Sequence, residues 1–332
     1  CSAASPKKIR SGEIWPDNHG VHINAHGGGM LYHDGVYYWY GENKSDTTSN
    51  AMVGIMCYSS SNLTDWKNEG VALSVVKDDE NSDIVPGCIM ERPKVIYNAK
   101  TSKFVMWFHL ELKGKGYEAA RSAVAVADCP TGPFQYIRSE RINAGKLPFD
   151  MTAAQRAELD TLDADKYQEW WTPAWHEAIH KGLFVKRDLP GGQMARDMQL
   201  FVDDDGKVYF YWGCSNETPM WGVELDPQTM NPKGEKKELI YADPYKYGYE
   251  RIGDDNSELP RSEEEVDACF DNFMKSQGTP VEQIPQMYIP MIRGMFTDKP
   301  YIEGAWMDKH DGRYYLQYAF AGTQYNTYGD GV

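Results

Sequence analysis

Three carboxylates and a histidine stand at matching places ahead of four aromatic hairpin sequences. His26, Asp197 and Glu303 each precede a turn glycine by nine residues. Glu91 fits the same pattern if the turn that follows it is two residues longer. Carboxylates that converge from separate elements can carry out general acid–base catalysis or hold a metal ion. If the hairpins surround one axis, this shared position places the four side chains around one well.

The hairpins themselves are predicted from their turns. An Asp-Gly turn between alternating aromatic and aliphatic residues is a strong short-range signal for a β-hairpin. Repetition of this phrase along one chain indicates a repeat architecture. The copies are MLYHDGVYYWYG at 30–41, LFVDDDGKVYFYWG at 200–213, WMDKHDGRYYLQYA at 306–319 and a looser KVIYNAKTSKFVMWFH at 94–109.

The pattern predicts an all-β fold, a five-bladed β-propeller with helical insertions. We expect a leader at 1–20 and a propeller domain at 21–332, with insertions at about 143–193 and 243–298. The blades are expected at about 22–75, 86–140 and 194–242, and from about 300 onward. Because the sequence stops inside an expected outer strand of blade four, the rest of that blade and blade five are expected beyond it. Helices are predicted after Thr152 and Ser262, each a favourable N-cap.

Composition narrows the classes of partner. The net charge of −15 argues against nucleic acid or an anionic membrane as a partner. No apolar run approaches the roughly 20 residues that cross a bilayer. The six cysteines form no CxxC pair and show no metal-ligand spacing. Cys1, followed by small and polar residues, resembles the start of an exported bacterial lipoprotein, periplasmic or at the cell surface; the alternative is a sequence that begins at Cys by coincidence.

Several of the candidate residues have ordinary alternatives. His26 precedes three glycines. It is either a structural histidine in a glycine-rich turn or a residue of the site. Glu91 and Arg92 form a surface ion pair or reach the site. Asp197 caps a strand or takes part in chemistry. The acids at 203–205 are turn residues, or ligands of a structural calcium ion.

Glu303 and a second motif suggest different chemistries. Glu303 lies between aromatic residues and before Gly304, and burial against Tyr301 and Trp306 is expected to raise the pKa of its carboxyl group, as a proton donor requires. HEAIH at 176–180 matches the HExxH zinc motif, but no third ligand follows at the expected spacing. A zinc peptidase is therefore an alternative, and the preferred interpretation is an insertion that packs over the site.

Together these motifs resemble glycoside hydrolase family 43, whose members are five-bladed β-propeller enzymes, and most closely its branch with exo-β-1,3-galactanases. The resemblance covers nearly the whole chain outside the two insertions. The motifs that carry it are HGGG at 26–29 with DGVYYWYGE at 34–42, ERPKVIYN at 91–98, RDMQLFVDDDGKVY at 196–209 and IEGAWMDKHDGRYYLQY at 302–318.

The resemblance implies inverting hydrolysis with Glu303 as general acid and Asp197 as the residue that tunes its pKa. The family's blade-one acid is absent, with His26 near its place. A base would then come from a fifth blade, and Glu91 is the fallback for positioning water. The sugar-site positions are matched by a further set, His26, Glu42, Arg92, Tyr117 and Thr323.

The implied function is an exported, exo-acting glycosidase that trims plant polysaccharide side chains, with β-galactosidase or exo-β-1,3-galactanase activity. The alternatives are an α-L-arabinofuranosidase or β-xylosidase of the same family, and a propeller that binds carbohydrate without catalysis. An oligo- or polysaccharide is the expected partner, a lipid on Cys1 the only expected membrane link, and no cofactor is required.

Overall fold

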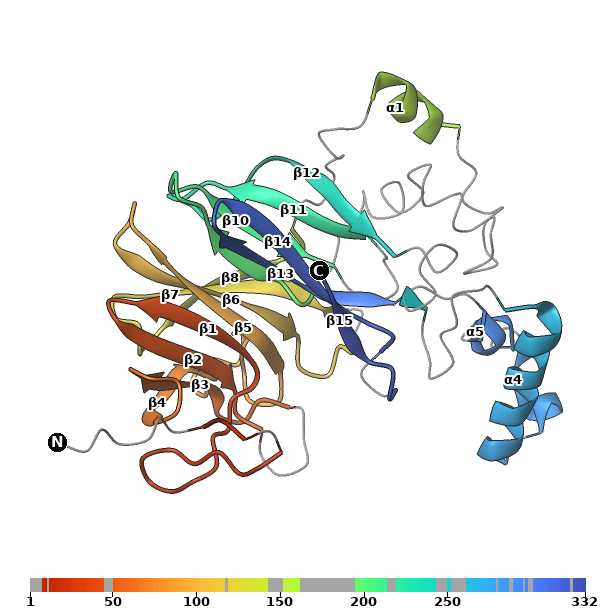
Figure 1. Cartoon of the computed structure of the whole chain (residues 1–332), viewed down its shortest axis with the longest axis horizontal. Coiled ribbons are helices and arrows are strands. Elements are labelled where there is room, and N and C mark those ends of the chain that lie inside the picture. The colour runs from red at the N-terminus through yellow and green to blue at the C-terminus, as the bar shows by residue number, and fades with distance from the viewer. Residues whose placement is uncertain are drawn as a thin grey trace. The chain divides into compact units, whose positions relative to one another are not determined.

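The computed structural model describes residues 8–10, 12–44, 50–116, 119–142, 152–161, 195–213, 219–242, 250–251, 261–278, 280–286, 289–294, 296–297, 301–322 and 325–332. Strands are the main regular element of this part of the chain (Figure 1). Among the described residues, no helix is both long and apolar enough to cross a membrane.

Within the described ranges, fifteen strands form four sheets, and each sheet follows the order of the chain. The first contains β1 (His26–His33), β2 (Val36–Glu42), β3 (Gly54–Ser60) and β4 (Lys67–Ser74). The second contains β5 (Ile89–Asn98), β6 (Lys103–Glu111), β7 (Arg121–Ala127) and β8 (Gln135–Glu140). The third contains β9 (Gln199–Val202), β10 (Val208–Trp212), β11 (Pro219–Leu225) and β12 (Pro232–Tyr241), and the fourth β13 (Ile302–His310), β14 (Arg313–Phe320) and β15 (Gly329–Gly331).

A meander of three or four antiparallel strands is the unit of a β-propeller blade. The four sheets coincide with the four blades expected from the sequence, so the all-β, propeller-type prediction is confirmed for blades one to four. The fifth blade stays a prediction. We refer to the sheets below as blades one to four.

The described helices lie in the insertions: α1 (Ala153–Leu159), α4 (Glu263–Gln277), the short 3₁₀ helix η5 (Val281–Gln283) and α5 (Ile289–Gly294). Both predicted N-caps are confirmed. The side-chain oxygens of Thr152 and Ser262 each accept a hydrogen bond from the backbone N–H three residues later, and the Gln155 and Glu265 side chains each accept one from the backbone N–H of the cap residue. These capping boxes satisfy backbone donors that a helix start leaves open.

The chain divides into two compact units. The first unit comprises 1–142, 194–209 and 225–231, and the second unit comprises 143–193, 210–224 and 232–332. Blades one and two and strand β9 belong to the first unit, whereas blade four and the helices belong to the second. Each unit is described by itself.

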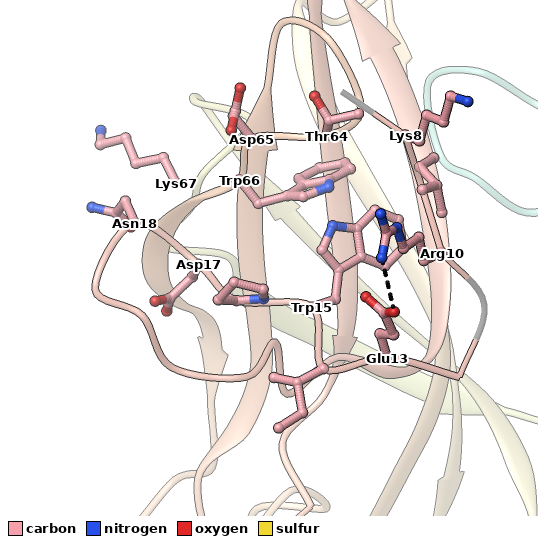
Figure 2. Close-up of a pocket in the computed structure, with 13 residues that line it drawn as sticks. Lys8, Arg10, Glu13, Trp15, Asp17, Asn18, Thr64, Asp65, Trp66 and Lys67 are labelled. Carbon is pink, nitrogen blue, oxygen red and sulfur yellow. Dashed lines mark hydrogen bonds and ion pairs between the residues drawn. The ribbon is translucent and has the colours of Figure 1, made fainter. Parts of the chain in front are cut away.

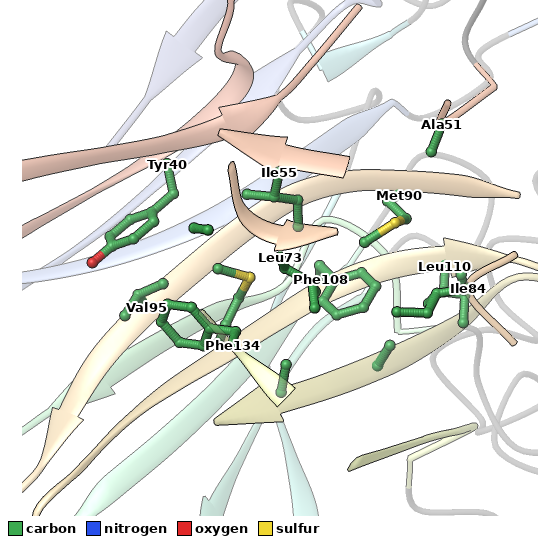
Figure 3. Close-up of a cluster of buried hydrophobic side chains, with 14 of the residues drawn as sticks. Tyr40, Ala51, Ile55, Leu73, Ile84, Met90, Val95, Phe108, Leu110 and Phe134 are labelled. Atoms are coloured by element: carbon green, nitrogen blue, oxygen red, sulfur yellow. The ribbon is translucent and has the colours of Figure 1, made fainter. Parts of the chain in front are cut away.

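The core of the first unit lies between blades one and two. It is a cluster of buried aliphatic and aromatic side chains (Figure 3), among them Ile55, Met90, Phe108 and Phe134. Tyr40 is fully buried there, and its hydroxyl donates to the carbonyl of Pro130 at 2.6 Å. Strand β1 packs against β5, and β5 against β9. The inner strands of three successive blades are therefore neighbours.

Candidate functional site

The same β-bulge occurs in the inner strand of three blades. Between the pairs His26–Glu42 and Gly29–Tyr40, two residues of β1 face one residue of β2. The same two-against-one arrangement follows Glu91 in β5 and Glu303 in β13. A bulge bends the strand and redirects the neighbouring side chains. His26, Glu91 and Glu303 thus occupy one equivalent place in three blades, as the sequence predicts.

The first bulged residue has a left-handed backbone in each blade: Gly27 with φ 59°, Arg92 with φ 53° and Gly304 with φ 68°. Glycine adopts this conformation without steric cost, which explains two of the three. Arginine does so at a cost, and such strain at a functional position persists only where surrounding contacts fix the backbone.

Blade three departs from the predicted alignment by one residue. Its turn is closed by the Asp203 N–H donating to the Lys207 carbonyl, which leaves three residues between them. The Asp-Gly turns of blades one and four have two residues, and the turn of blade two has four. Asp197, with φ 51°, therefore matches Arg92 and the other first bulged residues, and Arg196 takes the place matching Glu91. The predicted two-residue extension of the blade-two turn is confirmed.

A chain of charged contacts joins the predicted residues of blades one and two. His26 Nδ1 lies 2.7 Å from Glu42 Oε1. Lys44 Nζ lies 2.8 Å from the other oxygen of Glu42 and 3.4 Å from Glu91 Oε1. The Glu42 side chain is only 5% exposed and that of His26 is 66% exposed. Glu42 is thus a buried carboxylate that fixes the imidazole on one side and the lysine on the other.

Lys44 gains its proton affinity from these acids. Burial lowers the pKa of its amine, but the Glu42 and Glu91 carboxylates outweigh that effect and the pKa is raised. A lysine that stays charged between two carboxylates screens their repulsion, so Glu42 and Glu91 can remain close together in the folded protein.

Arg92 connects blade two to the start of blade three. Its Nε lies 3.3 Å from Asp197 Oδ1, and the Asp197 side chain is 14% exposed. Gly27 passes between these groups: a Cβ there would lie 2.9 Å from Glu42 Oε1 and 3.3 Å from Arg92 Cδ. Only glycine leaves room for the backbone at this point, because any side chain would meet both neighbours.

Lys94 is the first residue after the bulge in β5. Its Nζ is 3.4 Å from the carbonyl oxygen of Arg92, and a Cβ on Gly29 would lie 2.7 Å from its Cδ. Burial, and then the charge of Arg92, lower the pKa of Lys94 to about 8, although Asp197 and Glu42 act in the opposite direction. The first unit therefore gathers three cations and four acidic or imidazole groups at the bulges of its inner strands.

Glu303 lies in the second unit in an aromatic environment. It is 5% exposed, and the hydroxyls of Tyr301 and Tyr328 donate to its two carboxylate oxygens at 3.4 and 3.3 Å. The backbone N–H of Tyr301 donates to the carbonyl of Glu250, and the Tyr318 hydroxyl donates to the Glu250 carboxylate at 2.8 Å. The two hydroxyls fix the orientation of the Glu303 carboxyl group in its buried site.

The structure adds three residues to the predicted set, namely Lys44, Lys94 and Glu250. Lys44 lies two residues beyond Glu42, on the same side of an extended chain, so strand alternation carried a signal for it. Lys94 belongs to the ERPK motif, where the sequence predicts only a strand. Glu250 lies in an insertion, and its local sequence carries no signal.

The remaining predictions concern turns or fall outside the described residues. Asp203 and Asp205 accept hydrogen bonds from the backbone N–H groups of Asp204 and Lys207, as turn residues do. Among the described residues, no group of three or more His, Cys, Asp or Glu side chains is arranged to hold a metal ion. Residues that lie outside the description are Cys1, Tyr117, Thr323 and the HEAIH motif at 176–180.

We compared the chain with known protein families, sequences and structures. No protein-family model and no curated protein sequence matches the chain. Among solved structures, the glycoside hydrolase family 43 β-1,3-galactosidase BT3683, solved with galactodeoxynojirimycin, is 41% identical, with a TM-score of 0.72. The match covers 95% of this chain and 74% of that enzyme.

Two further structures are exo-β-1,3-galactanases. The enzyme from Clostridium thermocellum is 29% identical over 95% of this chain and 46% of its own, with a TM-score of 0.56. The enzyme from Phanerochaete chrysosporium, solved with β-1,3-galactotriose, is 28% identical over 70% of this chain and 42% of its own, with a TM-score of 0.51. The chain thus spans less than half the length of these two proteins.

The blade-type sheets agree with these matches. An identity of 41% over nearly the whole chain exceeds what a shared fold alone would produce. The protein belongs to glycoside hydrolase family 43 and is a glycosidase, an enzyme that hydrolyses the bonds between sugars.

Proposed function

We propose that the protein is an exo-acting β-1,3-galactosidase that removes terminal galactose from polysaccharide side chains with inversion. The observation that carries the choice of sugar is the 41% identity to a β-1,3-galactosidase solved with a galactose-shaped inhibitor. The two exo-β-1,3-galactanases with lower identity support the same class of substrate.

In the proposed reaction Glu303 is the general acid. Its protonated carboxyl group donates a proton to the glycosidic oxygen as the bond from that oxygen to the anomeric carbon breaks. A water molecule attacks the anomeric carbon from the opposite face and gives its own proton to a base. The products are the released sugar, a hemiacetal, and the shortened chain with a free hydroxyl, and the enzyme is restored once the proton held by the base returns to Glu303. The Tyr301 and Tyr328 hydroxyls orient the carboxyl group.

Asp197 and Glu91 have supporting roles in this proposal. Asp197, fixed by Arg92, tunes the proton affinity of the general acid, and Glu91, held by Lys44, positions the attacking water. Inversion requires the acid and the group opposite it to be roughly 6.5–9.5 Å apart, which leaves room for that water. Glu42 and His26 are assigned to sugar hydroxyls, since a buried carboxylate and an exposed imidazole present acceptors and donors side by side.

Replacement of Glu303 by Gln tests the assignment. The variant keeps the shape and the tyrosine contacts but has no proton to donate. We expect turnover of β-1,3-galactobiose to fall by about a hundredfold or more, and turnover of an aryl galactoside with an acidic leaving group to fall much less. Equal turnover by the variant and the parent on galactobiose contradicts the role of Glu303. Release of arabinose or xylose but no galactose by the parent contradicts the choice of sugar.

A further inference from the structure

A pocket lies beside the β3–β4 turn of blade one. Residues 8–10 and 13–18 lie beside the turn that connects β3 to β4, and together they line an open pocket of about 560 Å³ (Figure 2). The backbones of Asp17 and Trp66 form an isolated parallel β-bridge. The Asp17 carboxylate also accepts a hydrogen bond from the Asn68 side chain at 3.0 Å. These contacts hold the part of this N-terminal segment around Asp17 against the blade.

The pocket is remote from the charged cluster around Glu42. In blade one Glu42 pairs with Ile55, whereas Ser60, which precedes the β3–β4 turn, pairs with Tyr37. Five residues of strand, roughly 16 Å at about 3.3 Å per residue, separate these two ends, and Trp39, which backs the pocket, lies three residues along the strand from Glu42. A ligand in this pocket would not occupy the reaction centre.

Tryptophan side chains form one wall of the cavity. Trp15 is partly exposed, and its ring lies edge-to-face with that of Trp66 at 6.2 Å (Figure 2). Trp39 packs behind both, 5.3 Å from Trp15 and 5.4 Å from Trp66. Trp66 is only 2% exposed, and its indole N–H donates to the carbonyl of Leu63. The wall is therefore held rigidly before any ligand arrives, which lowers the entropic cost of binding.

The polar groups of the pocket carry no net charge. The charged residues that line the pocket are three cations, Lys8, Arg10 and Lys67, and three acids, Glu13, Asp17 and Asp65. Asp17 is already bonded to the backbone N–H groups of His19 and Val21. At the rim, the Arg10 guanidinium and the Glu13 carboxylate are 3.4 Å apart, with 72% and 61% of their side chains exposed.

This balance favours one class of ligand. A phosphate or nucleotide needs a surplus of cations, and an organic cation needs a surplus of acids. A neutral pyranose needs an aromatic face for its C–H bonds and paired donors and acceptors for its hydroxyls, and the pocket offers both. Its volume lies within the range of small-molecule sites and accommodates a short saccharide.

We propose that this pocket, with Trp15 as its stacking platform and Arg10 and Glu13 at its rim, binds a neutral saccharide segment of the polymeric substrate away from the reaction centre. The identity of that sugar as β-1,3-galactan rests on the proposed function; the pocket itself does not. A second attachment point raises the local concentration of polymer ends at the reaction centre, as linked binding sites do.

Affinity electrophoresis through gels that contain β-1,3-galactan, arabinan or xylan tests the proposal. The parent carries Glu303→Gln so that the gel is not hydrolysed. Trp15→Ala and the double variant Arg10→Ala with Glu13→Ala are placed in this background, and Tyr32→Ala, an exposed aromatic residue elsewhere on blade one with 60% exposure, is the matched control. We expect both pocket variants to lose about fivefold or more in affinity for one polymer, and the control to match the parent.

The same substitutions in the active enzyme separate the pocket from the reaction centre. Hydrolysis of an aryl β-galactoside is expected to stay unchanged, whereas kcat/KM on the polymer falls with the loss of retention. If Trp15→Ala also lowers thermal stability, the exposed Arg10 and Glu13 double variant decides. Retention of both variants at the parent's level in every gel overturns the proposal. Loss of retention by the pocket variants in the arabinan or xylan gel, with no galactoside hydrolysed by the active enzyme, rejects the proposed function and leaves the pocket in place.

Discussion

Arg92 and Asp197 hold the same backbone conformation in successive blades and form an ion pair, with Nε and Oδ1 3.3 Å apart. Both have positive φ, 53° for Arg92 and 51° for Asp197. Each residue therefore has two roles. It adopts a left-handed backbone conformation in or next to an inner strand, and it is one partner in an ion pair between blades. The two roles can be separated by substitution.

Asp197→Asn and Asp197→Ala should differ in stability and agree in activity. Asparagine tolerates a left-handed backbone, whereas alanine pays roughly 1–2 kcal/mol for it. Both variants lose the carboxylate that Arg92 holds. We expect glycosidase turnover to fall at least tenfold in both, and urea unfolding to show Ala less stable than Asn by about 1 kcal/mol.

Two outcomes contradict this account of Asp197. Wild-type turnover by the Asn variant means that the carboxylate takes no part in the reaction. Equal stability of the Asn and Ala variants means that the positive φ at this position stores no strain.

Lys94 should make the protein more stable as the pH rises above about 8. Burial, together with Arg92, lowers the pKa of this amine to about 8 from 10.5. Between these two values the unfolded chain keeps the proton and the folded chain releases it. Because the unfolded state binds more protons there, the free energy of unfolding increases with pH, and below pH 8 the cost of the buried charge is fully present.

The comparison of wild type with Lys94→Met isolates this group. The difference in free energy of unfolding, wild type minus variant, is expected to rise by up to about 2 kcal/mol between pH 8 and pH 9.5. Lys100→Met, at an exposed position, is the control and should show no such slope. A flat difference for Lys94 across this range would mean that its amine keeps an ordinary pKa in the folded protein.

Gly28→Ala should disturb Trp39 and the start of blade one. A Cβ at Gly28 would lie 2.2 Å from Trp39 Nε1 and 2.8 Å from the carbonyl oxygen of Tyr40. Since the backbone cannot yield there without breaking the β1–β2 ladder, we expect a loss of about 1–3 kcal/mol in stability. The displaced indole should also shift the tryptophan emission spectrum.

Gly35→Asn is the matched control for this change. Gly35 has φ 83°, and a Cβ there meets no atom within 4 Å. Asparagine adopts that conformation at small cost, so the variant should lose less than about 1 kcal/mol and keep the wild-type emission. An unchanged emission spectrum and stability for Gly28→Ala would show that the Trp39 indole can move aside freely.

The sequence by itself determined the local elements. Asp-Gly turns between alternating aromatic residues predicted the hairpins of blades one and four, and the positive φ of Asp34 and Asp311 matches the turn type that such pairs form. Thr152 and Ser262 marked helix starts. The spacing that relates His26, Glu91 and Glu303 also emerged from the sequence, because equal strands and countable turns carry one position into the next blade.

Tertiary structure alone decided what those positions contact. A blade-three turn one residue longer than those of blades one and four moves Asp197 to the position of the first bulged residues of the other blades, a difference that spacing from the turn glycine cannot reveal. Lys44 between Glu42 and Glu91, and the pocket between the N-terminal segment and Trp66, join residues that are distant along the chain. Side-chain period and turn chemistry are local properties, whereas bulges and the packing of one inner strand on the next depend on contacts between blades.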